Sequence, residues 1–368
     1  MGEIIIMTDR HGIVCAGVSC LDLFILGTSP LATRESLSLA TGAEYRAGGA
    51  TSNTGKALVR MGQYTEYMTV IGKDENGQIL KNMWTKDGIN LDAVTYHDTV
   101  GSSLSVLPVY SDGKRGVYFS IGTNGETTID NLFGENRKYL SVLKERLVFH
   151  YGYPPLTPKL QGDNLKEMLK AVYETGVLVS LDTTPLVEEG KLTEMLAPAL
   201  TYTHLFAPNI DEASQVTGHF NKLNERAQAD GKDIEDIITI AELQEVSHRL
   251  LSYGIPIVVL TLGKRGAYLC TGNEDAIKRI PGYFDLKASD ANISSFIPTF
   301  EIPEAINTTG AGDTFTAGIL IGLVNKQGRL TDIVRIAQAA AAIHVSTTEG
   351  ILSYEQIIEA AKTMKARE

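Results

Sequence analysis

The stretch NTTGAGDTFTAG at residues 307–318 begins as a turn of small residues and continues as a helix. The helix is predicted from one apolar face at helical spacing, formed by Phe315, Ile319, Leu320 and Leu323. Gly310 and Gly312 leave backbone N–H groups free to converge at the helix N-terminus, where the helix dipole adds partial positive charge. The sequence therefore predicts an anion-binding turn made of Gly310, Ala311 and Gly312.

Asp313 stands in the first turn of that helix, directly after the anion-binding turn. An acidic residue in this position ordinarily caps the helix or offsets its dipole, and that structural role remains an alternative. A carboxylate beside an anion site can also accept a hydroxyl proton while the site stabilises a phosphoryl group in transfer. We therefore expect Asp313 to act as a general base.

Short β-branched runs alternate with amphipathic helical stretches through most of the chain, which is typical of a parallel sheet covered by helices. In one complete unit, a helix capped by Asp163 or Asn164 precedes a strand that ends at Asp182. Two further strands run into Asn209 and Thr261. Because ligands bind beyond the carboxyl ends of such strands, we expect these polar residues to face one site.

Four segments depart from this alternation. Residues 23–45 and 100–121 are rich in Thr, Ser, Val and Tyr without a helical period, and Asp112-Gly113 is a hairpin-type turn. We expect them to form the strands of a small separate sheet. The polar runs 221–236 and 288–297 are expected to be surface excursions.

The composition excludes several classes of function. A hydrophobic fraction of 43% with 21% charged residues is ordinary for a globular protein, and a net charge of -11 argues against a nucleic-acid partner. The three cysteines form no CxxC motif and leave an odd thiol, which indicates a reducing compartment. No apolar segment is long enough to span a bilayer. We therefore expect a cytoplasmic protein without a membrane or nucleic-acid partner.

Two familiar nucleotide motifs are approximated but fail in detail. Residues 50–56 read AxxxxGK, yet Ala57 follows where a P-loop needs Ser or Thr, and no buried strand precedes the loop. Gly310-Ala311-Gly312 could open a dinucleotide-binding turn, but Phe315 occupies the place of its third small residue. Neither a P-loop NTPase nor a dinucleotide-dependent oxidoreductase is expected.

Five motifs together resemble the PfkB or ribokinase-like carbohydrate kinases. Residues 307–318 are similar to the C-terminal signature of that family, and residues 48–53 (GGATSN), followed by Gly72-Lys73-Asp74 and Gly77, are similar to its N-terminal signature. Residues 209–212 (NIDE) resemble its NxxE element, and residues 261–266 (TLGKRG) resemble its TxGxxG nucleotide loop. Residues 17–22 (GVSCLD) resemble its substrate-binding segment. The motifs follow the order of the family and cover nearly the whole chain.

The resemblance implies a ribokinase-like three-layer α/β sandwich, with a mostly parallel central sheet covered by helices and a small β-sheet lid. The large domain would comprise residues 1–22, 46–99 and 122–368, and the lid residues 23–45 and 100–121. The family transfers the γ-phosphoryl group of ATP to a hydroxyl of a small molecule with Mg²⁺, so ATP and Mg²⁺ are the expected cofactors. Closure of the lid would exclude water from the reaction.

The resemblance also assigns roles to single residues. Asp313 becomes the base beside the anion hole of Gly310, Ala311 and Gly312. Substrate contacts are implied for Asp22, Gly48, Gly49, Asn53 and Asn124, although Asn124 has a structural role as a polar loop residue as its alternative. Nucleotide contacts are implied for Asn209, Thr261, Gly263, Gly266 and Gln338, and a metal contact for Glu212. Asp182 lies where the family often keeps an acid, but its neighbours Thr183-Thr184-Pro185 are less typical and leave its role open.

One departure bears on cofactors. Asn307 stands where the family usually has Asp, tied to a monovalent cation, so activation by potassium is doubtful. The substrate class stays open among sugars, sugar acids, sugar phosphates and nucleosides, because pocket shape rather than motifs sets specificity. A nucleoside kinase and a catalytically silent sugar-sensing protein of the same fold remain alternatives. A homodimer formed through the lid is expected, since its exposed strand edges can pair.

Overall fold

A central eight-stranded sheet runs through the computed structural model, which describes residues 10–31, 35–111, 114–185, 190–302, 305–306, 308–347 and 352–367. The strand order is β14-β13-β12-β11-β10-β9-β1-β4. The bounds are β1 Ile13–Gly17, β4 Thr65–Met68, β9 Val148–Gly152, β10 Leu178–Leu181, β11 Leu205–Phe206, β12 Ile257–Thr261, β13 Gly266–Thr271 and β14 Ser294–Pro298. Neighbouring strands are parallel from β12 through β11, β10, β9 and β1 to β4. Strands β13 and β14 extend the sheet beyond β12, each antiparallel to its neighbour.

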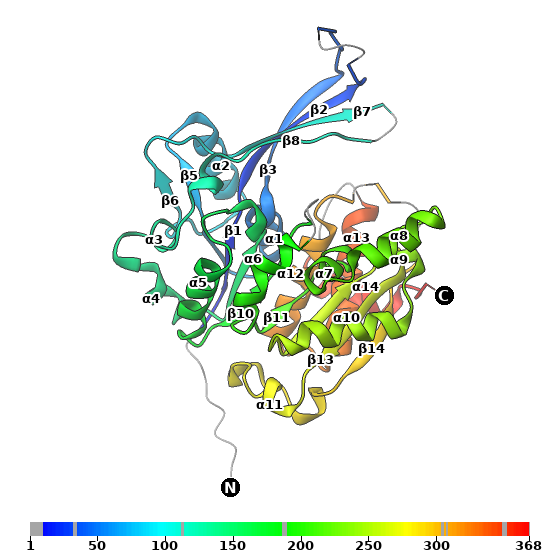
Figure 1. The fold of residues 1–368 in the computed structure, drawn as a ribbon. Coiled ribbons are helices and arrows are strands. Elements are labelled where there is room, and N and C mark those ends of the chain that lie inside the picture. The colour runs from blue at the N-terminus through cyan, green and yellow to red at the C-terminus, as the bar shows by residue number, and fades with distance from the viewer. Residues whose placement is uncertain are drawn as a thin grey trace.

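Helices cover both faces of the sheet (Figure 1). One face packs against α1 Gly49–Arg60, α2 Glu75–Lys86, α12 Ala311–Val324, α13 Leu330–Ser346 and α14 Tyr354–Thr363. The other packs against α3 Ile129–Leu132, α4 Tyr139–Leu143, α5 Asp163–Tyr173, α6 Lys191–Leu200, α7 Ile210–Thr217, α8 Phe220–Ala229, α9 Ile234–Ile237 and α10 Ile240–Ser252. Strand β1 is buried along its whole length, which explains its continuous apolar sequence.

The repeating unit read from the sequence is confirmed. Helix α5 buries the apolar stripe at its predicted spacing, and β10 follows it and ends directly before Asp182. The predicted cap is wrong: Gly162 is the N-cap residue, and no side chain caps the helix by a hydrogen bond. Asp163 instead lies in the first turn, where its negative charge interacts favourably with the positive end of the helix dipole.

A separate four-stranded sheet projects from the body and is also predicted from the sequence (Figure 1). Its order is β3-β2-β7-β8, with bounds β2 Cys20–Thr28, β3 Gly42–Gly48, β7 Leu104–Tyr110 and β8 Tyr118–Ser120. Strands β2 and β3 reach beyond the expected segment 23–45, to Cys20 and Gly48. Asp112-Gly113, the expected hairpin turn, lies outside the described residues. A small two-stranded sheet, β5 Val70–Gly72 with β6 Thr95–His97, completes the strands described.

Both expected surface excursions contain regular structure. The run 221–236 forms most of α8 and the start of α9, and α8 buries only the pair Leu223 and Ala227, four residues apart. The run 288–297 contains most of β14, an edge strand of the main sheet that is largely half-exposed. Narrow apolar stripes and edge positions tolerate polar residues, so neither element had a strong periodic signal.

The three cysteines, Cys15, Cys20 and Cys270, are buried and free. Within the ranges that the structure describes, no helix has both the length and the apolar character needed to cross a bilayer.

Candidate active site

The carboxyl ends of the parallel strands and the N-termini of α1 and α12 meet at one edge of the central sheet. Asp182 follows β10 and Thr261 ends β12 at this edge. Helix α12 begins after its N-cap residue Gly310 and places Asp313 in its first turn. Asn53 in α1 contacts Asp313 across the gap between the two helices. The sequence motifs that lie far apart along the chain therefore share one site, as expected for an open α/β sheet.

Asp313 is buried, and three side chains donate hydrogen bonds to its carboxylate. Asn53 Nδ2 and the Tyr153 hydroxyl each lie 3.1 Å from Oδ2, and the Thr54 hydroxyl lies 3.1 Å from Oδ1. Burial raises the pKa of Asp313 to about 6, while the three hydrogen bonds oppose that rise. The carboxyl group is thus fixed in place and has a pKa close to neutral, which suits a general base.

Tyr153 is a site residue that the motifs did not reveal. It follows β9 and adopts a left-handed backbone conformation with φ 61°, which is unfavourable for residues other than glycine. Burial, followed by the charge of Asp313, raises the pKa of Tyr153 well above its ordinary value, so its hydroxyl remains a donor. Its position directly after a buried strand was the available signal, the same signal that identified Asp182 and Thr261.

Two further buried carboxylates lie near Asp313. Burial, followed by the charges of Glu212 and Asp313, raises the pKa of Asp182 well above its ordinary value. Burial also raises the pKa of Glu212 to about 8, assisted by the charges of Asp211 and Asp313 and opposed by hydrogen bonding with Asn209. This edge of the sheet therefore gathers three buried carboxyl groups that are costly to ionise together.

Asn209 and Glu212 form a reciprocal capping box at the start of α7. Glu212 N donates to Asn209 Oδ1, and Asn209 N donates to Glu212 Oε2, both at 2.9 Å. The structural role of this pair is therefore realised, and one carboxylate oxygen of Glu212 lies outside the capping box. Among the described residues, no group of three or more His, Cys, Asp or Glu side chains is arranged as a metal site.

The expected substrate residues lie where the four-stranded sheet joins the body. Asp22 in β2 faces Gly48 at the start of α1, and a Cβ on Gly48 would lie 2.0 Å from Asp22 Oδ2. Gly48 thus makes room for the Asp22 carboxylate. Gly49 is the first residue of α1 and precedes Asn53 by one turn. Asn124 is buried; its Oδ1 accepts from the Ser19 backbone N–H, and its Nδ2 donates to the Ser19 carbonyl. These bonds favour the structural alternative for this loop residue.

A cavity of about 320 Å³ opens beside the anion-binding turn. The predicted nucleotide residues Thr261, Gly263, Gly266 and Gln338 line it together with Ala311 and Gly312. Apolar side chains, including Phe300 and Phe315, form other parts of its wall. Gln338 Nε2 donates to the Ile297 carbonyl at 2.7 Å, whereas its buried Oε1 has no partner among the described residues. An apolar cavity with one unpaired amide acceptor can hold a heteroaromatic base.

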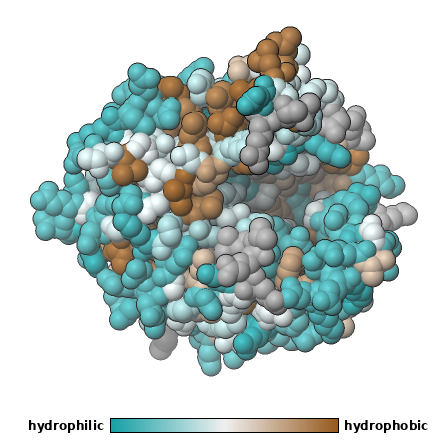
Figure 2. Space-filling view, turned by 45° about the horizontal axis from the view of Figure 1, so that its top comes forward, coloured by the Kyte–Doolittle hydropathy of each residue, from teal (hydrophilic) through white to brown (hydrophobic). Residues whose placement is uncertain are grey.

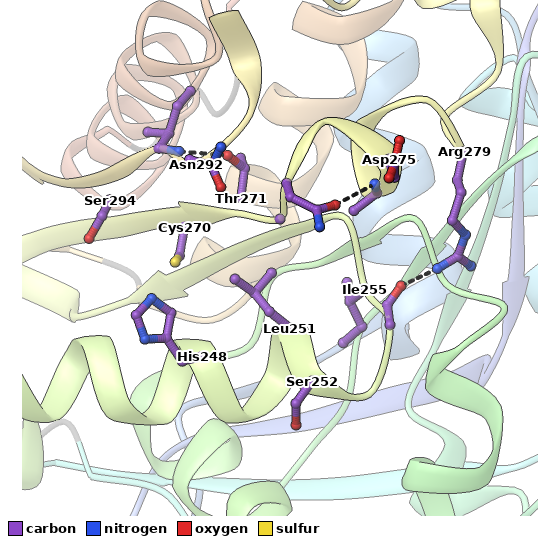
Figure 3. A pocket seen from close by; sticks show the side chains of 15 residues that line it. His248, Leu251, Ser252, Ile255, Cys270, Thr271, Asp275, Arg279, Asn292 and Ser294 are labelled. Carbon is purple, nitrogen blue, oxygen red and sulfur yellow. Dashed lines mark hydrogen bonds between the residues drawn. The ribbon is translucent and has the colours of Figure 1, made fainter. Parts of the chain in front are cut away.

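A larger pocket of about 600 Å³ contains none of the predicted site residues (Figure 3). It lies between α10 and the end of β13, with His248 and Cys270 in its wall. Thr271 at that end of β13 pairs with Ile257, the first residue of β12. The pocket therefore lies at the opposite edge of the sheet from Thr261, away from Asp313.

Of the other expectations, Asn307 lies outside the described residues, so its relation to a monovalent cation stays a prediction. Nε2 of His344, in α13, lies 2.8 Å from the carbonyl oxygen of Thr309, the residue directly before Gly310. This hydrogen bond supports the anion-binding turn.

Comparisons with known proteins show the family and the fold of the chain. Residues 11–357 match the family described as pfkB family carbohydrate kinase. The chain is 23% identical to a probable fructokinase-5 of Arabidopsis thaliana over 98% of this chain and 99% of that protein. It is similar in structure to Arabidopsis thaliana ribokinase complexed with ribose and ATP, with a TM-score of 0.72, 19% identity, and coverage of 96% of this chain and 99% of that one.

A nucleoside kinase of Methanocaldococcus jannaschii, described as an archaeal member of the ribokinase family, has a TM-score of 0.66 and 18% identity over 96% of this chain and 99% of that one. These structural likenesses confirm the expected ribokinase-like fold, with its mostly parallel central sheet and small separate sheet. Since the family match extends over nearly the whole sequence, the chain belongs to the pfkB family of carbohydrate kinases.

Proposed function

We propose that this kinase transfers the γ-phosphoryl group of ATP to a hydroxyl of a sugar, with Asp313 as general base. One observation carries the proposal: Asp313 is buried, held by three donors, and placed beside the anion-binding turn. The apolar cavity with Gln338 adjoins that turn through Ala311 and Gly312, and helix α1, which donates to Asp313 from Asn53, begins beside Asp22. The cavity suits a nucleotide, the turn a phosphoryl group in transfer, and the Asp22 region a sugar.

In this mechanism the Asp313 carboxylate accepts the proton of the sugar hydroxyl as its oxygen attacks the γ-phosphorus. The bond from that phosphorus to the bridging oxygen of ADP breaks, and its electron pair leaves with ADP. Backbone N–H groups of Gly310 and Gly312, with the dipole of α12, stabilise the charge on the transferring group, and that of Ala311 joins them once it leaves its 3.3 Å bond to the Thr308 carbonyl. Asn53, Thr54 and Tyr153 keep the carboxylate aimed at the hydroxyl.

Mg²⁺ is the expected metal, and the buried carboxylates of Asp182 and Glu212 suit a divalent cation. Each has a pKa raised by burial and by nearby negative charge, so a cation would relieve an existing repulsion. Glu212, supported by Asn209, would hold the ion, directly or through water, against the nucleotide phosphates. Bound there, Mg²⁺ neutralises charge on the phosphates.

The four-stranded sheet is proposed to be a lid. We retain the division into a large domain of residues 1–22, 46–99 and 122–368 and a lid of residues 23–45 and 100–121. Asp22 lies on strand β2 directly before the lid residues, so closure of the lid would cover a substrate contact and exclude water together.

A hexose or pentose is the proposed substrate. The similar proteins named as fructokinase and as ribokinase complexed with ribose support a free sugar. The similar nucleoside kinase keeps nucleosides as the second candidate. The buried Asp313 with its three donors, beside the turn of Gly310, Ala311 and Gly312, supports an active kinase over a sugar-sensing protein without activity.

ADP release from ATP and Mg²⁺ tests the proposal. We expect D-fructose, D-ribose or another sugar in a panel with nucleosides and sugar acids to stimulate ADP release, with one sugar phosphate formed for each ADP. Stimulation by nucleosides alone would move the assignment to a nucleoside kinase. Sugar binding measured by calorimetry without any ADP release would identify a sensor instead.

A further inference from the structure

Arg115 links the four-stranded sheet to the anion-binding turn. It lies between β7 and β8, where it forms an isolated bridge with Val109, and its side chain is exposed. Its guanidinium Nη1 donates to Thr309 Oγ1, and Thr309 directly precedes Gly310. A cation from the lid therefore reaches the residue beside the anion hole.

Arg115 also lies close enough to Asp22 to act on its carboxylate. Burial raises the pKa of Asp22, and the charges of Arg115 and Arg46 oppose that rise. Arg115 thus lies near both ends of the reaction path, with Asp22 on the sugar side and Thr309 on the phosphoryl side. Under the proposed function, the phosphoryl group moves from the Thr309 side to the Asp22 side, past Arg115.

The two arginines that act on Asp22, Arg46 and Arg115, differ in their partners. Arg46 pairs with Glu44, and its guanidinium lies 4.5 Å from the centre of the Phe24 ring. Arg115 has no carboxylate partner among the described residues. A guanidinium has five N–H donors in a planar fork that matches phosphoryl oxygens, and Thr309 can occupy only part of that capacity.

We propose that Arg115 is a further catalytic residue, whose guanidinium contacts the phosphoryl group during transfer. This inference rests on the proposed kinase function. As the sugar oxygen bonds to the γ-phosphorus and the bond to ADP breaks, negative charge spreads over the remaining phosphoryl oxygens. The electron pair leaves with ADP and the sugar proton goes to Asp313, while Arg115 keeps its own protons and stabilises the charge. Because Arg115 belongs to the lid, the contact forms only when the lid is closed, which ties closure to chemistry.

Steady-state kinetics of Arg115→Ala, Arg115→Lys and the matched Arg46→Ala test the proposal. Removal of a charge-stabilising donor costs about 10²- to 10³-fold in kcat, and we expect that loss in Arg115→Ala. Its sugar KM should change by less than about threefold, because the contact is made in the transition state. The kcat of Arg115→Lys should lie between those of Arg115→Ala and the unaltered protein, since lysine keeps the charge but lacks the planar fork of donors. Arg46→Ala should lose less kcat than Arg115→Ala.

Added guanidinium ion gives a second measurement that a structural role of Arg115 would not affect. We expect it to raise the kcat of Arg115→Ala in a saturable manner and to leave Asp313→Asn and Arg46→Ala unimproved. Thermal unfolding should be unchanged, because Arg115 is exposed.

Unchanged kcat in Arg115→Ala would overturn the inference while the kinase assignment stands on Asp313. A raised KM confined to acidic substrates, with kcat intact, would also overturn it and make Arg115 a receptor for a substrate anion. Absence of ADP release by the unaltered protein with every sugar and nucleoside tested would instead reject the proposed function, and the inference with it.

Discussion

Burial and hydrogen bonding act in opposite directions on the pKa of Asp313. Burial raises it to about 6, and the donor hydrogen bond of Tyr153 is one of three that lower it. Since the base must be ionised, kcat/KM should fall tenfold per pH unit as the pH drops below about 6.

Tyr153→Phe removes one of those donors, so the pKa of Asp313 should rise and the acid limb should move to higher pH. The pH profile of kcat/KM measures this shift. Tyr151→Phe is the matched control, because the Tyr151 hydroxyl bonds Thr157 rather than Asp313. An acid limb that stays in place, or moves to lower pH, would mean that Tyr153 does not influence the base.

Glu212 offers a second test at the level of one side chain. Glu212→Gln keeps an amide oxygen that can accept from Asn209 N, so α7 should remain capped while the charge is lost. We expect the Mg²⁺ concentration for half-maximal activity to rise and sugar binding to stay nearly unchanged. Glu242→Gln, in the capping box that starts α10, is the control. If both variants give the same Mg²⁺ titration, Glu212 only caps α7 and does not hold the metal.

At the scale of one element, two of the three glycines of α12 have clearly different surroundings. Apart from its chain neighbours and the backbone of its own helix, a Cβ on Gly312 would meet no atom of the described residues within 4 Å, and Gly312 lines the candidate nucleotide cavity. A Cβ on Gly318 would lie 2.7 Å from the Cα of Ala337 in α13. Gly312 is thus open towards a ligand, whereas Gly318 allows two helices to approach.

Gly312→Ala should therefore keep or slightly raise the free energy of unfolding, by up to about 1 kcal/mol, because alanine favours the helix. Its KM for ATP should rise clearly, since the new methyl group enters the space beside the anion hole. Gly318→Ala should lower stability without a specific effect on ATP. Thermal unfolding and ATP titrations separate the two, and normal ATP kinetics in Gly312→Ala would place the phosphates elsewhere.

The elements show which parts of the fold the sequence could predict. Helix α5 and strand β10 were predictable because each has a strong local period and lies fully against the core. Helix α8 and edge strand β14 were not, because each buries few side chains and tolerates polar residues.

The site divides in the same way. Asp313 and the anion-binding turn lie in one short continuous motif, so the sequence could place them together. Tyr153 and Arg115 reach Asp313 and Thr309 from segments far away in the chain, and only the folded arrangement reveals those contacts. Asn53 was predicted as a substrate residue, and its contact with the base also became visible only in three dimensions.

At the scale of the whole molecule, most of the large apolar side chains that are exposed among the described residues lie in or beside the four-stranded sheet (Figure 2). The exposed apolar side chains in or beside this sheet are Leu31, Leu37, Leu39, Tyr45, Val117, Tyr118 and Ile121. Such a surface with open strand edges favours association, so we expect a homodimer formed through the lids. Light scattering at micromolar concentration should give the dimer mass, and Leu37→Asp with Leu39→Asp should reduce it. A monomer for the unaltered protein would exclude this assembly.

The central claim is that Asp313 removes the proton from the sugar hydroxyl, and the kcat of Asp313→Asn tests it most directly. Asparagine keeps the size of the side chain but cannot accept the proton, so the folded variant should still bind ATP and sugar. General-base assistance is worth about 10²- to 10⁴-fold in rate, and kcat should fall at least that far while KM moves little. An Asp313→Asn protein that retains more than about a tenth of the normal kcat would contradict the claim and place the base elsewhere.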